Sequence, residues 1–142
     1  MSLLFVGELN PYGSDQHFAL YHLPRHASGN RLREILGLSD VAYSKLAKVN
    51  LCTGRWSMPA ARTAAGGLML MHYRVIVALG AKVRAAFDGP ACFETQRRAG
   101  LTLIAFPHPS GRNRAWDAPG ARECARALLA EQLGAAGAEG AA

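Results

Sequence analysis

The chain has 142 residues, half of them apolar and 18% charged, and its formal net charge is +6. This composition is enough for one compact domain, and it excludes a wholly disordered chain and a collagen-like one. No run of 18 apolar residues occurs, which argues against a transmembrane helix. Of the 16 basic residues, 13 are arginine, so both a polyanionic partner and an ordinary solvated surface fit the charge.

The spacing of the cysteines and the first seven residues bear on the cellular compartment in which we expect the protein. Cys52, Cys92 and Cys124 are widely spaced and include no CxxC pair, which argues against a disulfide framework and a zinc ribbon. Residues 1–7 contain no basic region, so they are interpreted as the beginning of a first strand and not as a signal peptide. We therefore expect a cytoplasmic protein that does not associate with a membrane.

The apolar pattern predicts alternating strands and helices. Residues 3–6 form a short apolar run that is typical of a strand buried on both faces, and Gly7 ends it. The elements expected after it are, in chain order, helices over 28–36 and 40–46, a strand over 47–52, a helix over 60–72, a strand over 75–79, a helix over 81–87, a strand over 101–106 and a helix over 120–133.

Four short apolar strands separated by helices predict an α/β fold. We expect a single domain with three α/β/α layers and a central four-stranded, mainly parallel sheet. Residues 134–142, which are Gly, Ala and one Glu, are expected to form a flexible tail. Polar loops follow three of the strands, at 8–15, 50–56 and 108–116. Ligands bind beyond the carboxyl ends of strands in such sheets, so these loops are the predicted site.

The last loop carries the most distinctive residues. His108 lies between two prolines that hold its backbone, so its ring can donate one aimed hydrogen bond. Ser110 and nearby backbone amides can contact a phosphate, and Arg112 and Arg114 add positive charge. Taken alone, a His-Pro pair is better explained by a turn with a capping serine and solvated arginines.

Three short motifs together resemble the uracil-DNA glycosylase superfamily. His108-Pro109-Ser110 after an apolar strand resembles its second motif, and Gly7-Glu8-Leu9-Asn10-Pro11 resembles its first. The Asn-Pro pair is nearest to the mismatch-specific and single-strand-selective branches. Asn50 stands at the end of the second predicted strand, where the superfamily holds a base-reading Asn. The resemblance spans roughly residues 3–116 and implies that residues 1–133 form a uracil-DNA glycosylase-like domain.

The resemblance implies a monofunctional DNA glycosylase. Such an enzyme hydrolyses the N-glycosidic bond of a flipped uracil-like, deaminated or modified pyrimidine and leaves an abasic site. Asn50 would read the edge of the base, and His108 would stabilise the negative charge that develops on it. Asn10 is the first choice for the residue that positions the attacking water, and Glu8 is its competitor. The iron–sulfur branches need four cysteines, so no cluster is expected.

The same resemblance suggests how DNA would be held. Phe18 resembles the position that stacks on the flipped base, and Tyr12 is a second candidate. The segment Gly111-Arg112-Asn113 stands where relatives place an intercalating wedge, often a leucine, and with Ser110 and Arg114 it would contact DNA. No cofactor is expected because water is the only co-substrate. A lyase step is not expected because no lysine lies in the three loops.

Other functions fit the same residues. One alternative is a glycosylase that removes a modified base from foreign DNA as a defence, and another is a glycosylase-like module that binds DNA or a base without cleaving it. An α/β enzyme acting on free nucleotides is a further alternative. His17, His22 and His26 have spacings of a kind seen in metal sites, but no further ligands accompany them, so no metal is expected. The chain is expected to be a monomer.

Overall fold

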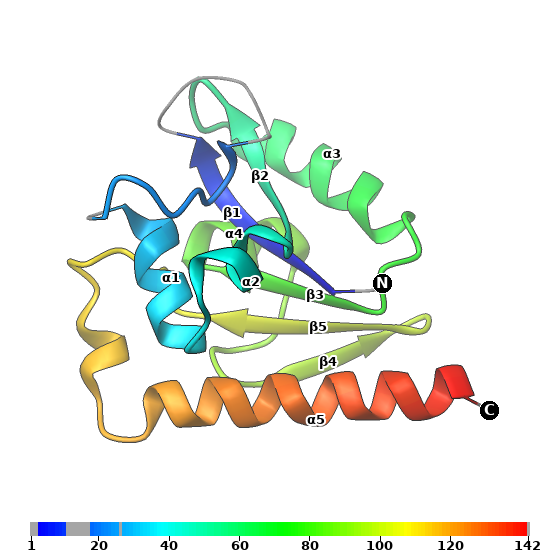
Figure 1. The fold of residues 1–142 in the computed structure, drawn as a ribbon. Helices are drawn as coiled ribbons and strands as arrows, with labels where there is room; N and C mark the ends of the chain where they lie inside the picture. The colour runs from blue at the N-terminus through cyan, green and yellow to red at the C-terminus, as the bar shows by residue number, and fades with distance from the viewer. Residues whose placement is uncertain (1–2, 11–17, 26, 142) are drawn as a thin grey trace.

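Five strands form the central sheet, in the order β2-β1-β3-β5-β4, and helices cover both of its faces (Figure 1). The computed structural model describes residues 3–10, 18–25 and 27–141. The strands are β1 (Leu3–Asn10), β2 (Ala47–Thr53), β3 (Val75–Leu79), β4 (Thr95–Arg98) and β5 (Leu101–Phe106). The helices are α1 (Ser28–Leu36), α2 (Asp40–Ser44), α3 (Met58–Met69), α4 (Ala81–Phe87) and α5 (Ala121–Ala141), with a 3-10 helix over Arg114–Asp117.

The three-layer α/β/α fold predicted from the sequence is confirmed. Alternate residues of a strand face opposite layers, so two separate cores form. Leu3 and Phe5 of β1 pack in the core beneath α1, α2 and α5, whereas Leu4 and Val6 pack in the core beneath α3 and α4. This explains why the apolar runs are continuous and do not alternate with polar residues.

The sheet has five strands, and the prediction of four was wrong. β1, β2, β3 and β5 pair in parallel, and β4 pairs antiparallel with β5. The sequence of β4 is Thr-Gln-Arg-Arg, and most of it is exposed. An edge strand of polar residues has no apolar run to reveal it, and it forms here because the turn at Ala99-Gly100 folds it back onto β5.

Two predicted boundaries also differ. β1 does not end at Gly7 but continues to Asn10, because the strand keeps pairing with β2 as far as Thr53. α5 continues to Ala141, through most of the residues for which a flexible tail is predicted, as the strong helix propensity of its alanines permits. Of the helices in residues 3–10, 18–25 and 27–141, none is long and apolar enough to cross a membrane.

The parallel order brings the segments after several strands to one edge of the sheet. Gly7 of β1 is the register partner of Asn50 of β2. On the other side of β1, the turn after β3 is tied to the end of β5, because the Gly80 N–H donates to the Phe106 carbonyl at 2.9 Å. Residues from β1, β2 and the segment after β5 therefore meet.

Candidate functional site

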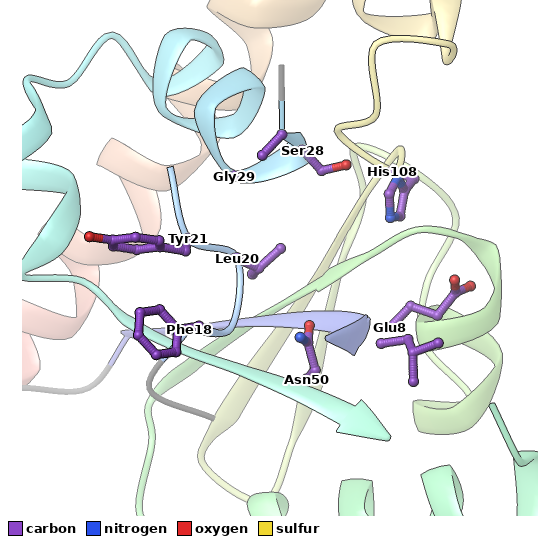
Figure 2. Close-up of a pocket in the computed structure, with 10 residues that line it drawn as sticks. Glu8, Phe18, Leu20, Tyr21, Ser28, Gly29, Asn50 and His108 are labelled. Atoms are coloured by element: carbon purple, nitrogen blue, oxygen red, sulfur yellow. The ribbon is translucent and has the colours of Figure 1, made fainter. Parts of the chain in front are cut away.

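A cavity of about 400 Å³ lies where these segments meet (Figure 2). Its walls come from β1, β2, the segment 18–21, the first turn of α1 and the loop after β5. The described residues that line it are Glu8, Leu9, Phe18, Leu20, Tyr21, Ala27, Ser28, Gly29, Asn50 and His108. The structure thus brings together four of the predicted site residues, namely Glu8, Phe18, Asn50 and His108.

His108 is held in one protonation state. The Ser110 backbone N–H donates to His108 Nδ1 at 3.1 Å, so this nitrogen acts as an acceptor and carries no proton. Burial lowers the pKa of His108 from its ordinary 6.5, although the Glu8 carboxylate opposes the shift. At pH 7 the ring is therefore neutral with its proton on Nε2, and Figure 2 shows the ring directed into the cavity.

Gly80 provides the space for this ring. Its φ of 97° is one that residues with a side chain rarely adopt. A Cβ at this position would lie 3.2 Å from His108 Cβ and 3.3 Å from His108 Cδ2. The glycine after β3 therefore lets the imidazole lie directly against the β3–α4 turn.

Asn50 is buried, with 4% of its surface exposed, yet its side chain lines the cavity. Gly7, its register partner, leaves room for this side chain, because a Cβ on Gly7 would overlap Asn50 Oδ1. Asn50 lies in the middle of β2, so the prediction that it ends the strand was wrong. Residues 51–53 continue the strand because β1 continues beside them.

The segment 18–24 forms one wall of the cavity in a fixed conformation. Leu20 has a φ of 53°, in the left-handed region that a branched residue enters only when its surroundings hold it there. The buried Tyr43 hydroxyl donates to the Leu20 carbonyl at 2.7 Å. Burial also raises the pKa of Tyr43, so the phenol keeps this donated proton. Neither Leu20 nor Tyr43 carries a sequence motif, and sequence reasoning missed both.

Two aromatic rings stand together in this wall. Phe18 and Tyr21 meet edge to face, with ring centroids 5.3 Å apart and an interplanar angle of 76°. Phe18 is 39% exposed, which is high for a phenylalanine whose ring also lines a cavity. The pair offers an apolar surface against which a planar ligand can lie.

Glu8 supplies the charged group of the cavity. Its Oε1 lies 3.8 Å from Lys82 Nζ, and that ammonium lies 5.8 Å from the centre of the Trp56 ring. Lys82 lies outside the three predicted loops, at the start of α4. The structure places it beside the site because β3, which leads into α4, is the neighbour of β1 in the sheet. Lys82 could be predicted as a site residue only from the strand order, which the sequence pattern does not give.

The remaining predicted residues are distributed as follows. Asn10 is the last residue of β1, and Tyr12 lies outside the described residues, as do His17 and His26. Residues 110–114 are absent from the described cavity lining. Asn113 caps the 3-10 helix, since its Oδ1 accepts from the Ala115 N–H at 3.0 Å. Gly111 and Arg112 are exposed on the loop that carries His108, and the exposed Arg114 begins the 3-10 helix that follows this loop.

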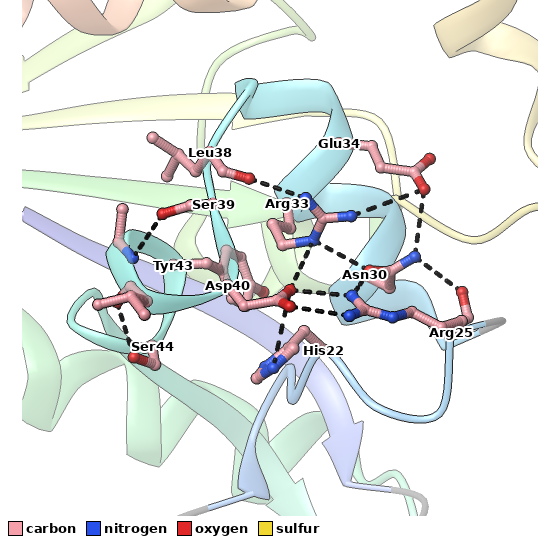
Figure 3. A network of polar contacts seen from close by, with 12 residues as sticks. His22, Arg25, Asn30, Arg33, Glu34, Leu38, Ser39, Asp40, Tyr43 and Ser44 are labelled. Atoms are coloured by element: carbon pink, nitrogen blue, oxygen red, sulfur yellow. Dashed lines mark hydrogen bonds and ion pairs between the residues drawn. The ribbon is translucent and has the colours of Figure 1, made fainter.

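A polar network fixes the far end of the 18–25 segment to α1 and α2 (Figure 3). Both terminal nitrogens of Arg25 contact the Asp40 carboxylate, at 2.9 and 2.8 Å, and Asn30 Nδ2 donates to the Arg25 carbonyl at 2.8 Å. The hydrogen bonds and charge of Arg25 lower the pKa of Asp40 to about 2. His22 borders this network, with Nε2 3.9 Å from Asp40 Oδ1. Within the described part of the chain, no three His, Cys, Asp or Glu side chains are grouped to hold a metal.

Comparison with known proteins places the chain in no family. No protein-family model matches the sequence, and a search of curated proteins found no match.

Proposed function

We propose that the chain is a DNA glycosylase of the uracil-DNA glycosylase type, which hydrolyses the N-glycosidic bond of a flipped pyrimidine-like base. The observation that carries this proposal is the convergence of His108, Asn50 and Glu8 on one cavity beside an aromatic wall. These residues come from three separate strands or strand ends. They are also the residue types that the reaction needs, namely an aimed donor, an amide and a carboxylate.

The base is held by its face and its edge. Its face lies against Phe18, where base and ring stack. Its edge meets the Asn50 side chain, which offers both a donor and an acceptor and suits the N3–H and O4 of a uracil-like base. The buried position of Asn50 excludes water that would compete for these hydrogen bonds.

His108 stabilises the leaving group. Cleavage of the glycosidic bond leaves negative charge on the base, chiefly at O2, and the Nε2–H of the neutral ring donates to that oxygen. A donor fixed in advance costs no reorganisation as charge develops, and one such donor is typically worth about 3–4 kcal/mol. The Ser110 N–H keeps the proton on Nε2, the nitrogen that can act as this donor.

Glu8 assists at the sugar. As the bond breaks, the deoxyribose approaches an oxocarbenium ion, which a carboxylate stabilises and a positioned water attacks. Glu8 lines the cavity and carries a negative charge, so we assign this role to Glu8 first. Asn10, two residues further along β1, stays a prediction for the water-positioning residue. It would orient water without offsetting the positive charge.

DNA is the substrate that the charge of the molecule favours. The net charge of +6 attracts a polyanion, and the exposed Arg112 and Arg114 lie on the loop that carries His108 and at the start of the 3-10 helix after it. A phosphate held by this loop would place its nucleotide beside the cavity. Water is the co-substrate, and no step of this scheme needs a cofactor.

An alkaline-cleavage gel tests the proposal. End-labelled single- and double-stranded oligonucleotides would carry uracil, hypoxanthine, xanthine, hydroxymethyluracil or a modified cytosine. The proposal predicts strand breaks after alkali at one of these bases, lost in His108→Ala and Asn50→Ala. The control is His72→Asn, which removes an exposed imidazole outside the cavity lining and should cleave like the wild type. Salt-sensitive DNA binding without breaks on any substrate would contradict the proposal and favour a non-catalytic binding module.

A further inference from the structure

A second pocket lies against the same aromatic pair that lines the cavity. Its volume is about 360 Å³, and the described residues that line it are Phe18, Tyr21, Leu23 and Pro24. We call it the flanking pocket. Phe18 and Tyr21 therefore line both hollows. A ligand in the flanking pocket would therefore contact the same two aromatic residues as a ligand in the cavity.

The flanking pocket is apolar and open to solvent. Leu23 is 40% exposed and Phe18 39%, although most large apolar side chains in the described residues are buried. Exposed apolar side chains that gather beside a polar cavity are typical of a binding surface. No charged side chain belongs to the described lining, so its occupant must present an apolar face.

The flanking pocket is also preformed. The Tyr43 hydroxyl holds the Leu20 carbonyl inside the segment, and the Arg25–Asp40 contacts hold the residue that follows Pro24 (Figure 3). A surface that is already fixed loses little conformational entropy when a ligand lies on it. The polar network therefore supports two binding surfaces on one short segment.

We propose that the flanking pocket binds the base of the nucleotide next to the target base, and that the substrate is single-stranded DNA. This inference rests on the proposed function. A nucleobase has an apolar face that stacks on aromatic and aliphatic side chains whatever its sequence. In a duplex the neighbouring base stays stacked and paired and cannot reach the pocket. An unpaired strand can place two successive bases on either side of the Phe18–Tyr21 wall.

Substrates that lack the flanking base test this inference. Single-stranded oligonucleotides would carry the excised base with a stable abasic analogue on its 5′ or its 3′ side. For the wild type, removing the base on one side should raise KM about tenfold, as expected for one lost stacking contact, and leave kcat nearly unchanged. In Leu23→Ala the intact substrate should already show the raised KM, and removing the flanking base should raise it no further.

The matched control is Leu70→Ala, which removes the same side chain from an 82% exposed position after α3 and should leave both KM values at the wild-type level. Equal KM values for intact and flank-abasic substrates in the wild type would overturn the inference. So would a flanking-base effect that persists undiminished in Leu23→Ala.

A binding experiment separates this inference from the proposed function. Fluorescence anisotropy would compare oligothymidine with an oligomer of abasic analogues on the same backbone, without any excision. The wild type should bind oligothymidine about tenfold more tightly, and Leu23→Ala should lose much of that preference while Leu70→Ala keeps it. If no base is excised but this pattern holds, the glycosylase proposal fails and the base-binding pocket stands. If bases are excised and the preference is unchanged in Leu23→Ala, the pocket assignment fails alone.

Discussion

One backbone amide and two glycines position the polar side chains of the cavity. The Ser110 N–H selects the tautomer of His108, and the absent side chain of Gly80 leaves room for its ring. Gly7 does the same for Asn50. The two polar side chains that we propose for base binding, His108 and Asn50, are therefore positioned by residues that line no part of the described cavity.

The protonation state of His108 gives a pH prediction. Protonation of Nδ1 would replace an acceptor by a donor facing the Ser110 N–H, so the neutral ring is the form that fits. Because burial lowers the pKa of His108, we expect it to titrate below 6.5, with the proton on Nε2 at pH 7. The native state then resists protonation, so this residue lowers stability as pH falls from 6.5 through its native pKa. Nitrogen-15 NMR of the histidine rings measures the tautomer and the pKa of His108. An Nδ1–H tautomer or a pKa above 6.5 would contradict the assignment.

Gly7→Ala tests the position of Asn50. The new Cβ would overlap Asn50 Oδ1, so the amide must leave its place and base recognition should fall. We expect kcat/KM to drop at least about tenfold, the effect of losing one good hydrogen bond to the base. Gly66→Ala is the control, since its Cβ meets nothing within 4 Å and an alanine inside α3 should stabilise the fold by about 0.5–1 kcal/mol. Wild-type kinetics in Gly7→Ala would exclude Asn50 from base reading.

At the scale of elements, one short segment carries the wall of the cavity and the flanking pocket. Residues 18–25 contain no long helix and no strand, only turns that begin at Phe18 and at Pro24, and they are held from α2 by Tyr43 and Asp40. α1 and α2 therefore support the site in addition to covering the sheet.

Tyr43→Phe tests this support. The substitution keeps the buried ring and removes the hydroxyl that donates to the Leu20 carbonyl, which leaves a left-handed residue without its anchor. We expect a loss of about 1–1.5 kcal/mol in the free energy of unfolding, the net value of one hydrogen bond, with a several-fold rise in KM. Urea denaturation and steady-state kinetics measure the two effects. If the free energy of unfolding falls and KM does not change, the hydrogen bond from Tyr43 to Leu20 stabilises the fold but does not support the cavity wall.

The elements also show what a sequence can and cannot predict. The buried strands β1, β3 and β5 were predictable because burial on both faces leaves an unbroken apolar run. β4 was not, because a polar edge strand exists only through its partner. His108 was predictable because it follows a buried strand between two prolines, whereas Glu8, which lies within β1, was named only because its motif resembles the first motif of the uracil-DNA glycosylase superfamily. Lys82 and Leu20 were missed because their place in the site depends on strand order and on a tertiary hydrogen bond.

At the scale of the whole molecule, the excess of arginine should act through phosphate contacts. Not all of the arginines are available for this. Arg25 contacts Asp40 at 2.8 Å and Arg62 contacts Asp88 at 3.2 Å, whereas Arg112 is exposed on the loop that carries His108 and Arg114 is exposed at the start of the 3-10 helix after it. We therefore expect Arg112 and Arg114, which follow His108 in the chain, to contact the phosphates.

Salt dependence measures this contribution. The logarithm of the DNA-binding constant should fall linearly with the logarithm of salt concentration, and Arg112→Ala should reduce the slope by about 0.7 on a single strand. Arg62→Ala removes an arginine that already contacts a carboxylate on the described surface, and it should leave the slope unchanged. Equal slopes for the wild type and Arg112→Ala would remove this loop from the phosphate-binding surface.

Release of a free base is the most direct test of the central claim that this cavity cleaves a glycosidic bond. Single-stranded DNA carrying the candidate bases would be incubated with the wild type and with His108→Ala, and mass spectrometry would analyse the small molecules released. The account predicts one free base and an intact DNA backbone with an abasic site for the wild type, and neither product at a comparable rate for His108→Ala. A wild-type protein that binds this DNA and releases no base, or one that releases it equally well without His108, would contradict the account.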